Sequence, residues 1–133
     1  MKYICFGYLD TTNWGKLSQS QQNAMIDACL AYDEVLKKNG NWAGGEGLQG
    51  PESTTTLQYQ NGKVAVTDGP YAETKELLGG LLMIEARDLN HAIQLISNHP
   101  GIKMGRWEIR PTQDLTPMIR ESEGRRQVKG GHG

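Results

Sequence analysis

The sequence of 133 residues predicts a single α+β domain, and three observations carry that prediction. Short segments of alternating apolar and polar residues, typical of half-buried strands, recur along the chain. Two longer segments instead place apolar residues at helical spacing. The pair Asn61-Gly62 lies between two alternating segments, which is a strong indication of a β-hairpin. Apart from the hairpin, the expected order is strand, helix, strand, strand, helix, strand, the ferredoxin-like βαββαβ arrangement.

The first part of the chain is expected to form a strand and then a long amphipathic helix. The strand covers Tyr3 to Tyr8. Ser18 is expected to cap the helix, with Gln21 completing a capping box, and Gly40 to follow its last turn in the left-handed conformation. The expected inner face of the helix is Met25, Ile26, Cys29, Tyr32 and Leu36, and the expected outer face is Asp27, Asp33, Glu34, Lys37 and Lys38.

The middle of the chain is expected to form a glycine-rich strand over 42–48 and then the hairpin. A type I′ turn at Asn61-Gly62 sets the hairpin register. The register puts apolar side chains on one face and polar ones on the other, as a half-solvated hairpin requires. It also brings Asp68 to the end of a strand, at the start of a polar loop. The expected pairs are Tyr59 with Val64, Leu57 with Val66, and Thr55 with Asp68.

After the loop, a helical turn is expected over 73–78, closed by Gly79-Gly80, and a buried strand over 81–86. Asp88 is expected to cap a second helix, which His99-Pro100-Gly101 ends because proline disfavours helical geometry in the residue before it.

The last strand is expected over 104–110, where alternation puts Trp107 and Ile109 on one face. From Thr112 the chain is polar and charged, with no periodic apolar face. We therefore expect a folded domain over 1–111 and a polar C-terminal tail over 112–133.

Composition argues against several classes of protein. The formal charge of −1 gives no general attraction to nucleic acid or to an anionic membrane. No apolar segment reaches the roughly 20 residues of a membrane span, and the N-terminus lacks the features of a signal peptide. Cys5 and Cys29 lack metal-binding or redox spacing, so free thiols in a reducing cytoplasm are expected. No nucleotide or metal motif is present, and no cofactor is expected.

The one-sided coverage of the sheet predicts a partner. Two long helices cover one face, and no third one is available for the other. Pairing with a second copy is the economical solution. We expect a homodimer whose two sheets meet face to face around a barrel-like interior.

Several motifs resemble those of the YCII-related family. They are Gly45-Glu46-Gly47-Leu48, Asn61-Gly62-Lys63, the segment 67–76 with Asp68-Gly69-Pro70-Tyr71 at its centre, Gly79-Gly80, His99-Pro100-Gly101, and Glu108-Ile109-Arg110-Pro111. More narrowly, the chain looks like the branch named for an Asp-Gly-Pro-Phe (DGPF) turn, with Tyr71 in place of the phenylalanine. The resemblance covers residues 1–111 and implies a dimeric α+β barrel, as in YciI-like proteins.

The resemblance also implies a possible catalytic pair. The better-known branch resembles muconolactone isomerase-like proteins, with a histidine on the first helix and an aspartate just before a proline. In this chain the first position falls near Cys29, and the second is His99 before Pro100. The histidine–aspartate pair is therefore not carried over, and a site is expected to use other residues.

The candidate residues each have a functional and a structural interpretation. Asp68 and Glu73 are the candidate catalytic acids or bases, but Asp68 could instead cap the Gly69-Pro70 turn. Glu73 and Lys75 could belong to a solvated helical turn. The candidate ligand-binding residues are Glu46, Tyr71, Lys75, Arg106 and His99. Arg106 would bind an anion if its sheet face looks into the dimer, and would only form surface ion pairs if that face is solvated.

Three functions stay open. The first is a small cytoplasmic dimer that binds or transforms a small, possibly anionic, organic molecule near Asp68, Glu46 and Arg106, by acid–base chemistry without a cofactor. The second is a non-catalytic ligand-sensing or accessory module, since members of the DGPF branch are often encoded beside sigma factors. The third is simple interaction through the dimer face. Nucleic acid is not an expected partner, because the basic residues of the tail are offset by acidic ones.

Overall fold

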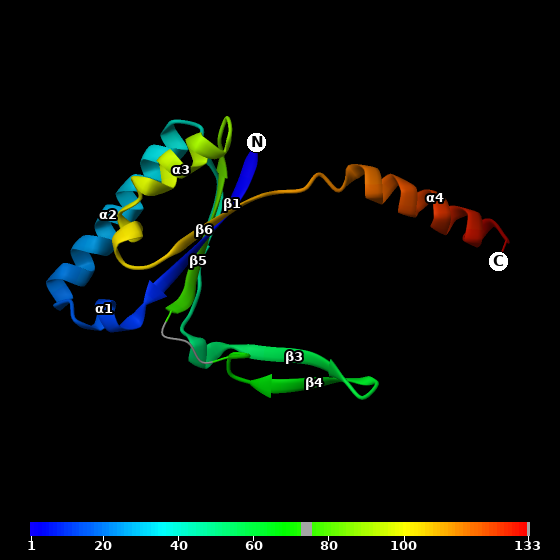
Figure 1. Cartoon of the computed structure of the whole chain (residues 1–133), viewed down its shortest axis with the longest axis horizontal. Helices are drawn as coiled ribbons and strands as arrows, with labels where there is room; N and C mark the ends of the chain where they lie inside the picture. Colours follow the sequence, from blue (N-terminus) through cyan, green and yellow to red (C-terminus); the bar gives the residue numbers. More distant parts are fainter. Residues whose placement is uncertain (73–75, 133) are drawn as a thin grey trace.

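In the computed structural model, residues 1–72 and 76–132 are described, the side chains as far as residue 127. They form a four-stranded sheet with helices on one face, a separate hairpin and a projecting C-terminal helix (Figure 1). The elements are β1 (Lys2–Asp10), α1 (Thr11–Gly15), α2 (Gln19–Lys38), β2 (Trp42–Gly47), η1 (Pro51–Ser53), β3 (Thr55–Gln60), β4 (Lys63–Asp68), β5 (Glu76–Glu85), α3 (Leu89–Ser97), η2 (Pro100–Lys103), β6 (Trp107–Pro111) and α4 (Thr116–His132).

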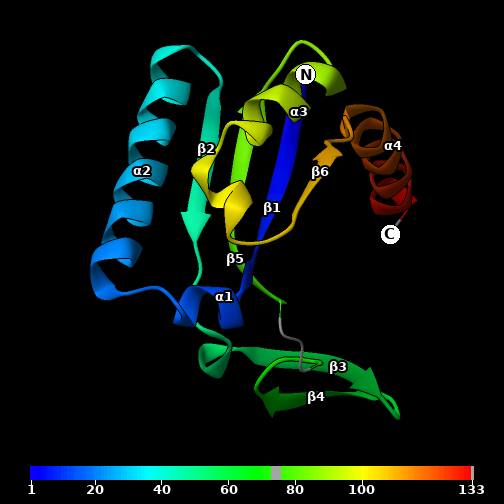
Figure 2. The same cartoon turned by 60° about the vertical axis from the view of Figure 1, so that its left-hand side comes forward.

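The main sheet has the strand order β2-β5-β1-β6, and each neighbouring pair is antiparallel. With the hairpin set aside, this order places the first strand between the third and the fourth. That is the ferredoxin-like arrangement, so the predicted α+β fold class is confirmed. The connections through α2 and α3 bring both helices to the same face of the sheet (Figure 2).

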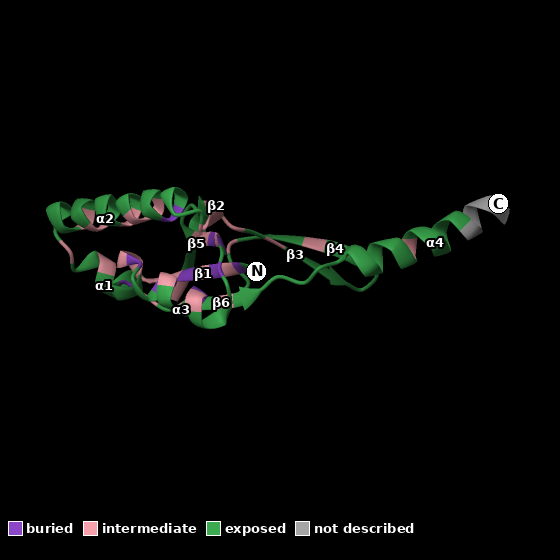
Figure 3. Cartoon of the chain, turned by 90° about the horizontal axis from the view of Figure 1, so that it is seen from above, coloured by how far each residue is buried: buried purple, intermediate pink, exposed green. Residues whose placement is uncertain are grey.

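The core lies between the sheet and α3. Cys5 and Ile84 are fully buried on the helix-facing side of β1 and β5, and Ala92 and Ile96 of α3 are buried with them. Because side chains alternate along a strand, neighbouring apolar residues point to the opposite face, where they are half-buried. Seen from above, α1, α2 and α3 lie to one side of the sheet strands (Figure 3). These half-buried apolar residues on the open face are Ile4, Phe6, Leu81 and Met83.

Local signals set the helix ends as predicted. Ser18 and Gln21 form the reciprocal hydrogen bonds of a capping box at the start of α2. Gly40, just beyond α2, has a φ of 76°, in the left-handed region. The Asp88 carboxylate accepts a hydrogen bond from the backbone N–H of His91 and caps α3.

The hairpin has the predicted register and the predicted turn. Each expected pair is present, and the turn residues Asn61 and Gly62 both have positive φ, 52° and 79°. The hairpin projects beyond the end of the main sheet instead of packing on it (Figures 1 and 2). Its apolar face is therefore exposed within the single chain: Leu57 is 64%, Tyr59 73%, Val64 57% and Val66 66% exposed.

One expectation about secondary structure is wrong. The helical turn expected over 73–78 is not formed by residues 76–78, which belong to β5, while residues 73–75 lie outside the described part of the chain. The strand forms there because Leu78, Leu77 and Glu76 pair with the end of β1, at Tyr8, Leu9 and Asp10. The segment expected as a polar tail over 112–133 contains the helix α4, whose described side chains are largely exposed.

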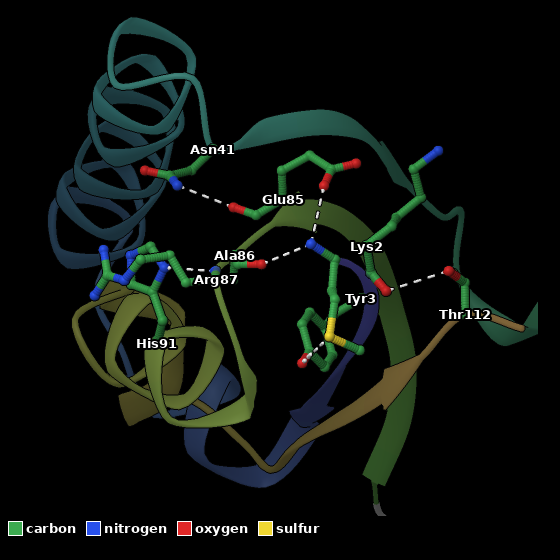
Figure 4. Close-up of polar contacts among 9 residues, drawn as sticks. Lys2, Tyr3, Asn41, Glu85, Ala86, Arg87, His91 and Thr112 are labelled. Atoms are coloured by element: carbon green, nitrogen blue, oxygen red, sulfur yellow. Dashed lines mark hydrogen bonds and ion pairs between the residues drawn. The ribbon is translucent and has the colours of Figure 1, made fainter.

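Polar contacts hold the sheet end that lies farther from the hairpin (Figure 4). The N-terminal amine donates to the carbonyl of Ala86 at 2.8 Å, and the Asn41 amide donates to the carbonyl of Glu85 at 2.9 Å. The Thr112 hydroxyl donates to the carbonyl of Lys2 at 3.2 Å. No helix within the described residues is both long and apolar enough to cross a membrane.

Candidate functional site

A cavity of about 720 Å³ lies between α2, η2 and the sheet. Three of its lining residues, Gly7, Gly80 and Gly47, lie side by side on three neighbouring strands. The indole of Trp107 covers Gly7, and a β-carbon at Gly7 would come within 2.9 Å of it. Most of the other lining residues are apolar, as is typical of small-molecule sites. They include Trp14, Met25, Ile26, Leu30, Trp42 and Met104.

Asp33 of α2 and His99, which caps η2, meet on the cavity wall. The Nε2 atom of His99 lies 3.4 Å from Oδ1 of Asp33, and Nδ1 accepts a hydrogen bond of 3.0 Å from the backbone N–H of Gly101. His99 is only 5% exposed. The rings of Tyr32 and Trp107 pack against its imidazole, with centroid distances of 5.4 and 4.9 Å.

Burial shifts both members of the pair toward their neutral forms. Desolvation raises the pKa of Asp33, against the opposing effects of His99 and Lys37. Desolvation also lowers the pKa of His99, against the opposing effect of Asp33. The adjacent Cys29 thiol has a raised pKa as well, mainly through burial. A titratable pair with shifted pKa values in a cavity is a common feature of acid–base sites.

This pair corrects two expectations from the sequence. Asp33 was placed on the outer face of the first helix, yet it faces the cavity and its side chain is only 17% exposed. A histidine–aspartate pair was not expected, but one is formed with the two residue types exchanged: aspartate on the helix and histidine before proline. The helical spacing could have revealed it, because Asp33 follows Cys29 by four residues and so shares its side of the helix.

The remaining predicted site residues occupy three different places. Glu46 lines the cavity together with His99. Asp68 is exposed at the end of β4, on the hairpin, and Tyr71 beyond it is 83% exposed. Glu73 and Lys75 lie outside the described residues. Within one described chain the hairpin residues therefore do not reach the cavity, and their binding or catalytic roles stay predictions.

Arg106 belongs to a polar cluster that faces away from the helices. Trp107 packs against the core, so its strand neighbour Glu108 points to the open face of the sheet. A hydrogen bond to the Glu108 carboxylate raises the pKa of Tyr8. Arg106 forms an ion pair with Glu76, with 3.7 Å between Nε and Oε2, and its side chain is 71% exposed. Arg106 and His99 are thus on opposite sides of the sheet.

The described residues offer little for a metal ion. Within them, no three histidine, cysteine, aspartate or glutamate side chains gather as a ligand group. The cavity wall instead brings together two titratable groups, a thiol and apolar surface. This arrangement suits the binding of an organic molecule and the movement of a proton.

The chain belongs to the YCII-related domain family, whose sequence profile matches residues 1–116. It is 34% identical over 113 residues to the uncharacterized protein R00369 of Rhizobium meliloti (strain 1021), an alignment that covers 84% of this chain and 91% of that protein. Among solved structures it is similar to 5-chloro-2-hydroxyhydroquinone dehydrochlorinase (TftG) from Burkholderia phenoliruptrix AC1100 in complex with 2,5-dihydroxybenzoquinone. That similarity has a TM-score of 0.45 and 18% identity, and covers 85% of this chain and 94% of the other.

Proposed function

We propose that this protein binds a small organic molecule in the cavity between α2 and the sheet, and that the Asp33–His99 pair transfers a proton on that molecule. The observation that carries the proposal is the position of the pair, two titratable side chains on the wall of a mostly apolar cavity. Apolar walls supply binding energy, and a few polar groups fix orientation and carry chemistry. The proton transfer needs only the protein's own side chains.

The charges around the cavity favour a neutral molecule over an anionic one. Three carboxylates, those of Asp33, Glu34 and Glu46, are among the lining groups. Lys37 is the cation among the described lining residues, and its ammonium lies 4.7 Å from the ring centre of Trp42. An anionic ligand would meet more like charge than opposite charge. We therefore favour neutral hydroxylated or carbonyl compounds as ligands.

Binding in the cavity can be tested by blocking it. Leu30 and Val35 are exposed aliphatic residues of α2, and only Leu30 lines the cavity. A thermal-shift screen of neutral phenols, quinones and enolisable ketones against the purified protein should give hits. The same hits should lose their shift with Leu30→Trp and keep it with Val35→Trp. Equal shifts with both variants would place the binding elsewhere and reject the cavity.

Proton transfer can be tested without knowing the complete reaction. Each compound that binds is incubated with the protein in D₂O, and ¹H NMR follows the exchange of its acidic C–H protons. We expect protein-dependent exchange that Asp33→Asn abolishes, because the carboxamide cannot accept the proton. Binding without exchange would reject proton transfer and favour the ligand-sensing module.

The proposal extends to the assembly and the compartment. We place the protein in the DGPF branch of its family, on the Asp68-Gly69-Pro70-Tyr71 segment. We place it in the cytoplasm, because free thiols such as those of Cys5 and Cys29 persist in a reducing compartment. We assign it a homodimeric state, because helices cover one face of the sheet and leave apolar residues on the other.

A further inference from the structure

The geometry of His99 leaves neither ring nitrogen for a ligand. Nδ1 accepts the hydrogen bond from the Gly101 N–H, so it carries no proton. In a neutral imidazole the proton must then be on Nε2, and Nε2 faces Oδ1 of Asp33 at 3.4 Å. The packed rings of Tyr32 and Trp107 limit rotation of the imidazole. His99 is therefore held as a donor toward Asp33, with no free lone pair for a proton from the cavity.

Asp33 has the complementary arrangement. Its Oδ1 atom is buried and makes no hydrogen bond of good geometry with the described residues, so the long contact with His99 is its polar partner. The Asp33 side chain is 17% exposed, compared with 6% for His99. Because Oδ1 is buried, Oδ2 is the carboxylate oxygen that we assign to contact with a ligand. Of the two residues, Asp33 is the one that a molecule in the cavity can reach.

We propose that Asp33 is the catalytic acid–base group and that His99 is a positioning residue, locked as its Nε2–H tautomer by the Gly101 amide. This inference rests on the proposed function. It exchanges the roles that the two residues have in a Ser-His-Asp triad, where histidine carries the proton and aspartate orients the histidine. In the forward step a C–H or O–H group of the ligand gives its proton to Oδ2, and the bonding electron pair remains on the ligand as an enolate or phenolate. The Nε2–H of His99 stays in place and stabilises Oδ1.

The surroundings support this assignment. A general base works best when its pKa is close to the working pH, and burial raises the pKa of Asp33 toward that range. His99 stays neutral, since burial lowers its pKa. The other titratable groups around the pair are Cys29 and Lys37 of α2, one turn to either side of Asp33, its helix neighbours Tyr32 and Glu34, and Glu46 on β2. Lys37 favours the charged carboxylate and so keeps Asp33 available as a base.

The tautomer can be measured on the unaltered protein without a ligand. A long-range ¹H–¹⁵N correlation spectrum distinguishes a protonated ring nitrogen from one with a free lone pair. We expect His99 to show a protonated Nε2 and an unprotonated Nδ1 at neutral pH, unlike a freely exposed histidine, which averages its forms. A protonated Nδ1, or averaging of both tautomers, would overturn the inference and leave the cavity proposal standing.

The positioning role can be tested through Asp33 itself. Carboxyl ¹³C titration should show a higher pKa for Asp33 in His99→Phe, which keeps a packed ring but loses the donor, than in the unaltered protein. In His99→Asn, whose amide can still donate, the pKa of Asp33 should return much of the way to its value in the unaltered protein. No change in either variant would overturn the positioning role.

The D₂O assay separates the two residues. Asp33→Asn should lose exchange by about 10²-fold or more, the usual effect of an acid–base residue. His99→Asn should retain measurable exchange. The opposite result, exchange lost in His99→Asn and kept in Asp33→Asn, would make His99 the base and overturn the inference. Absence of ligand exchange in the unaltered protein would reject the proposed proton transfer but not the tautomer assignment.

Discussion

At the scale of single residues, the burial of His99 and Asp33 makes the stability of the folded chain depend on pH. Both lie where desolvation opposes charge, so each binds its proton differently in the folded and unfolded chain. Stability rises with pH wherever the unfolded state binds more protons. The lowered pKa of His99 makes the unfolded chain the better proton acceptor just below 6.5, the ordinary pKa of histidine. Asp33 acts in the opposite direction and in a more acidic range, just above its ordinary 3.8.

We therefore predict that the free energy of unfolding falls as the pH decreases below about 6.5, and that His99→Asn removes this decline. The buried imidazole resists the proton that the unfolded chain accepts. Urea unfolding of both proteins at a series of pH values measures the effect. His91→Asn, a change of the α3 histidine, is the control and should keep the decline. Parallel pH profiles for the unaltered protein and His99→Asn would contradict the prediction.

A substitution at Gly7 tests how tightly the cavity wall is packed. A β-carbon here would lie 2.9 Å from two atoms of the Trp107 indole, which must then move. We predict that Gly7→Ala lowers the free energy of unfolding by about 1–3 kcal/mol, the usual cost of overpacking, and changes the fluorescence of Trp107. Chemical denaturation provides the measurement. Gly15→Ala is the matched control, because nothing lies within 4 Å of its added β-carbon. A Gly7→Ala protein as stable as the control would show that the indole moves freely.

At the scale of elements, the sequence predicted the features that depend on residues close together in the chain. The Ser18 capping box, the Asp88 cap and the Asn61-Gly62 turn each satisfy or shape their own backbone, so their patterns sufficed. The start of β5 could not be predicted this way. Glycine has a weak preference for any element, and Gly80 is extended because strands distant in the sequence flank it.

The candidate site was only partly predictable for a related reason. Glu46 and His99 were identified from the sequence, and both line the cavity. Asp33 was missed because its pairing with His99 is a tertiary contact between the first helix and a segment far along the chain. The four-residue spacing from Cys29 indicates the side of the helix on which Asp33 lies, but the sequence alone does not show that His99 is opposite it. The folded arrangement was needed to identify this partner.

The helix α4 buries little of its surface against the rest of the domain. Its described apolar side chains remain about half exposed, and it extends away from the sheet (Figure 1). We predict that truncation after Asp114 leaves the free energy of unfolding unchanged within about 0.5 kcal/mol, because little buried surface is lost. Urea unfolding at low protein concentration measures this. A loss of more than about 1 kcal/mol would show that α4 packs against the folded domain.

At the scale of the whole molecule, two apolar surfaces are left uncovered by the described residues of the single chain. One is the open face of the sheet, and the other is the apolar face of the hairpin, whose four large side chains are all more than half exposed. Exposed apolar surface of this extent is unusual in a monomer and marks an interaction site. The hairpin extends from the end of the sheet, so a second copy could cover both surfaces at once (Figure 2).

We predict that the protein is a homodimer, with a mass in multi-angle light scattering twice the 14.7 kDa of the chain. Leu57→Lys should shift it toward monomer, because the charge would be buried without a partner. Gln58→Lys is the matched control, since Gln58 is the adjacent residue on the polar face of the same strand. The control should remain dimeric. A dimer that survives Leu57→Lys would exclude the hairpin from the interface, and a monomeric unaltered protein would refute the assembly itself.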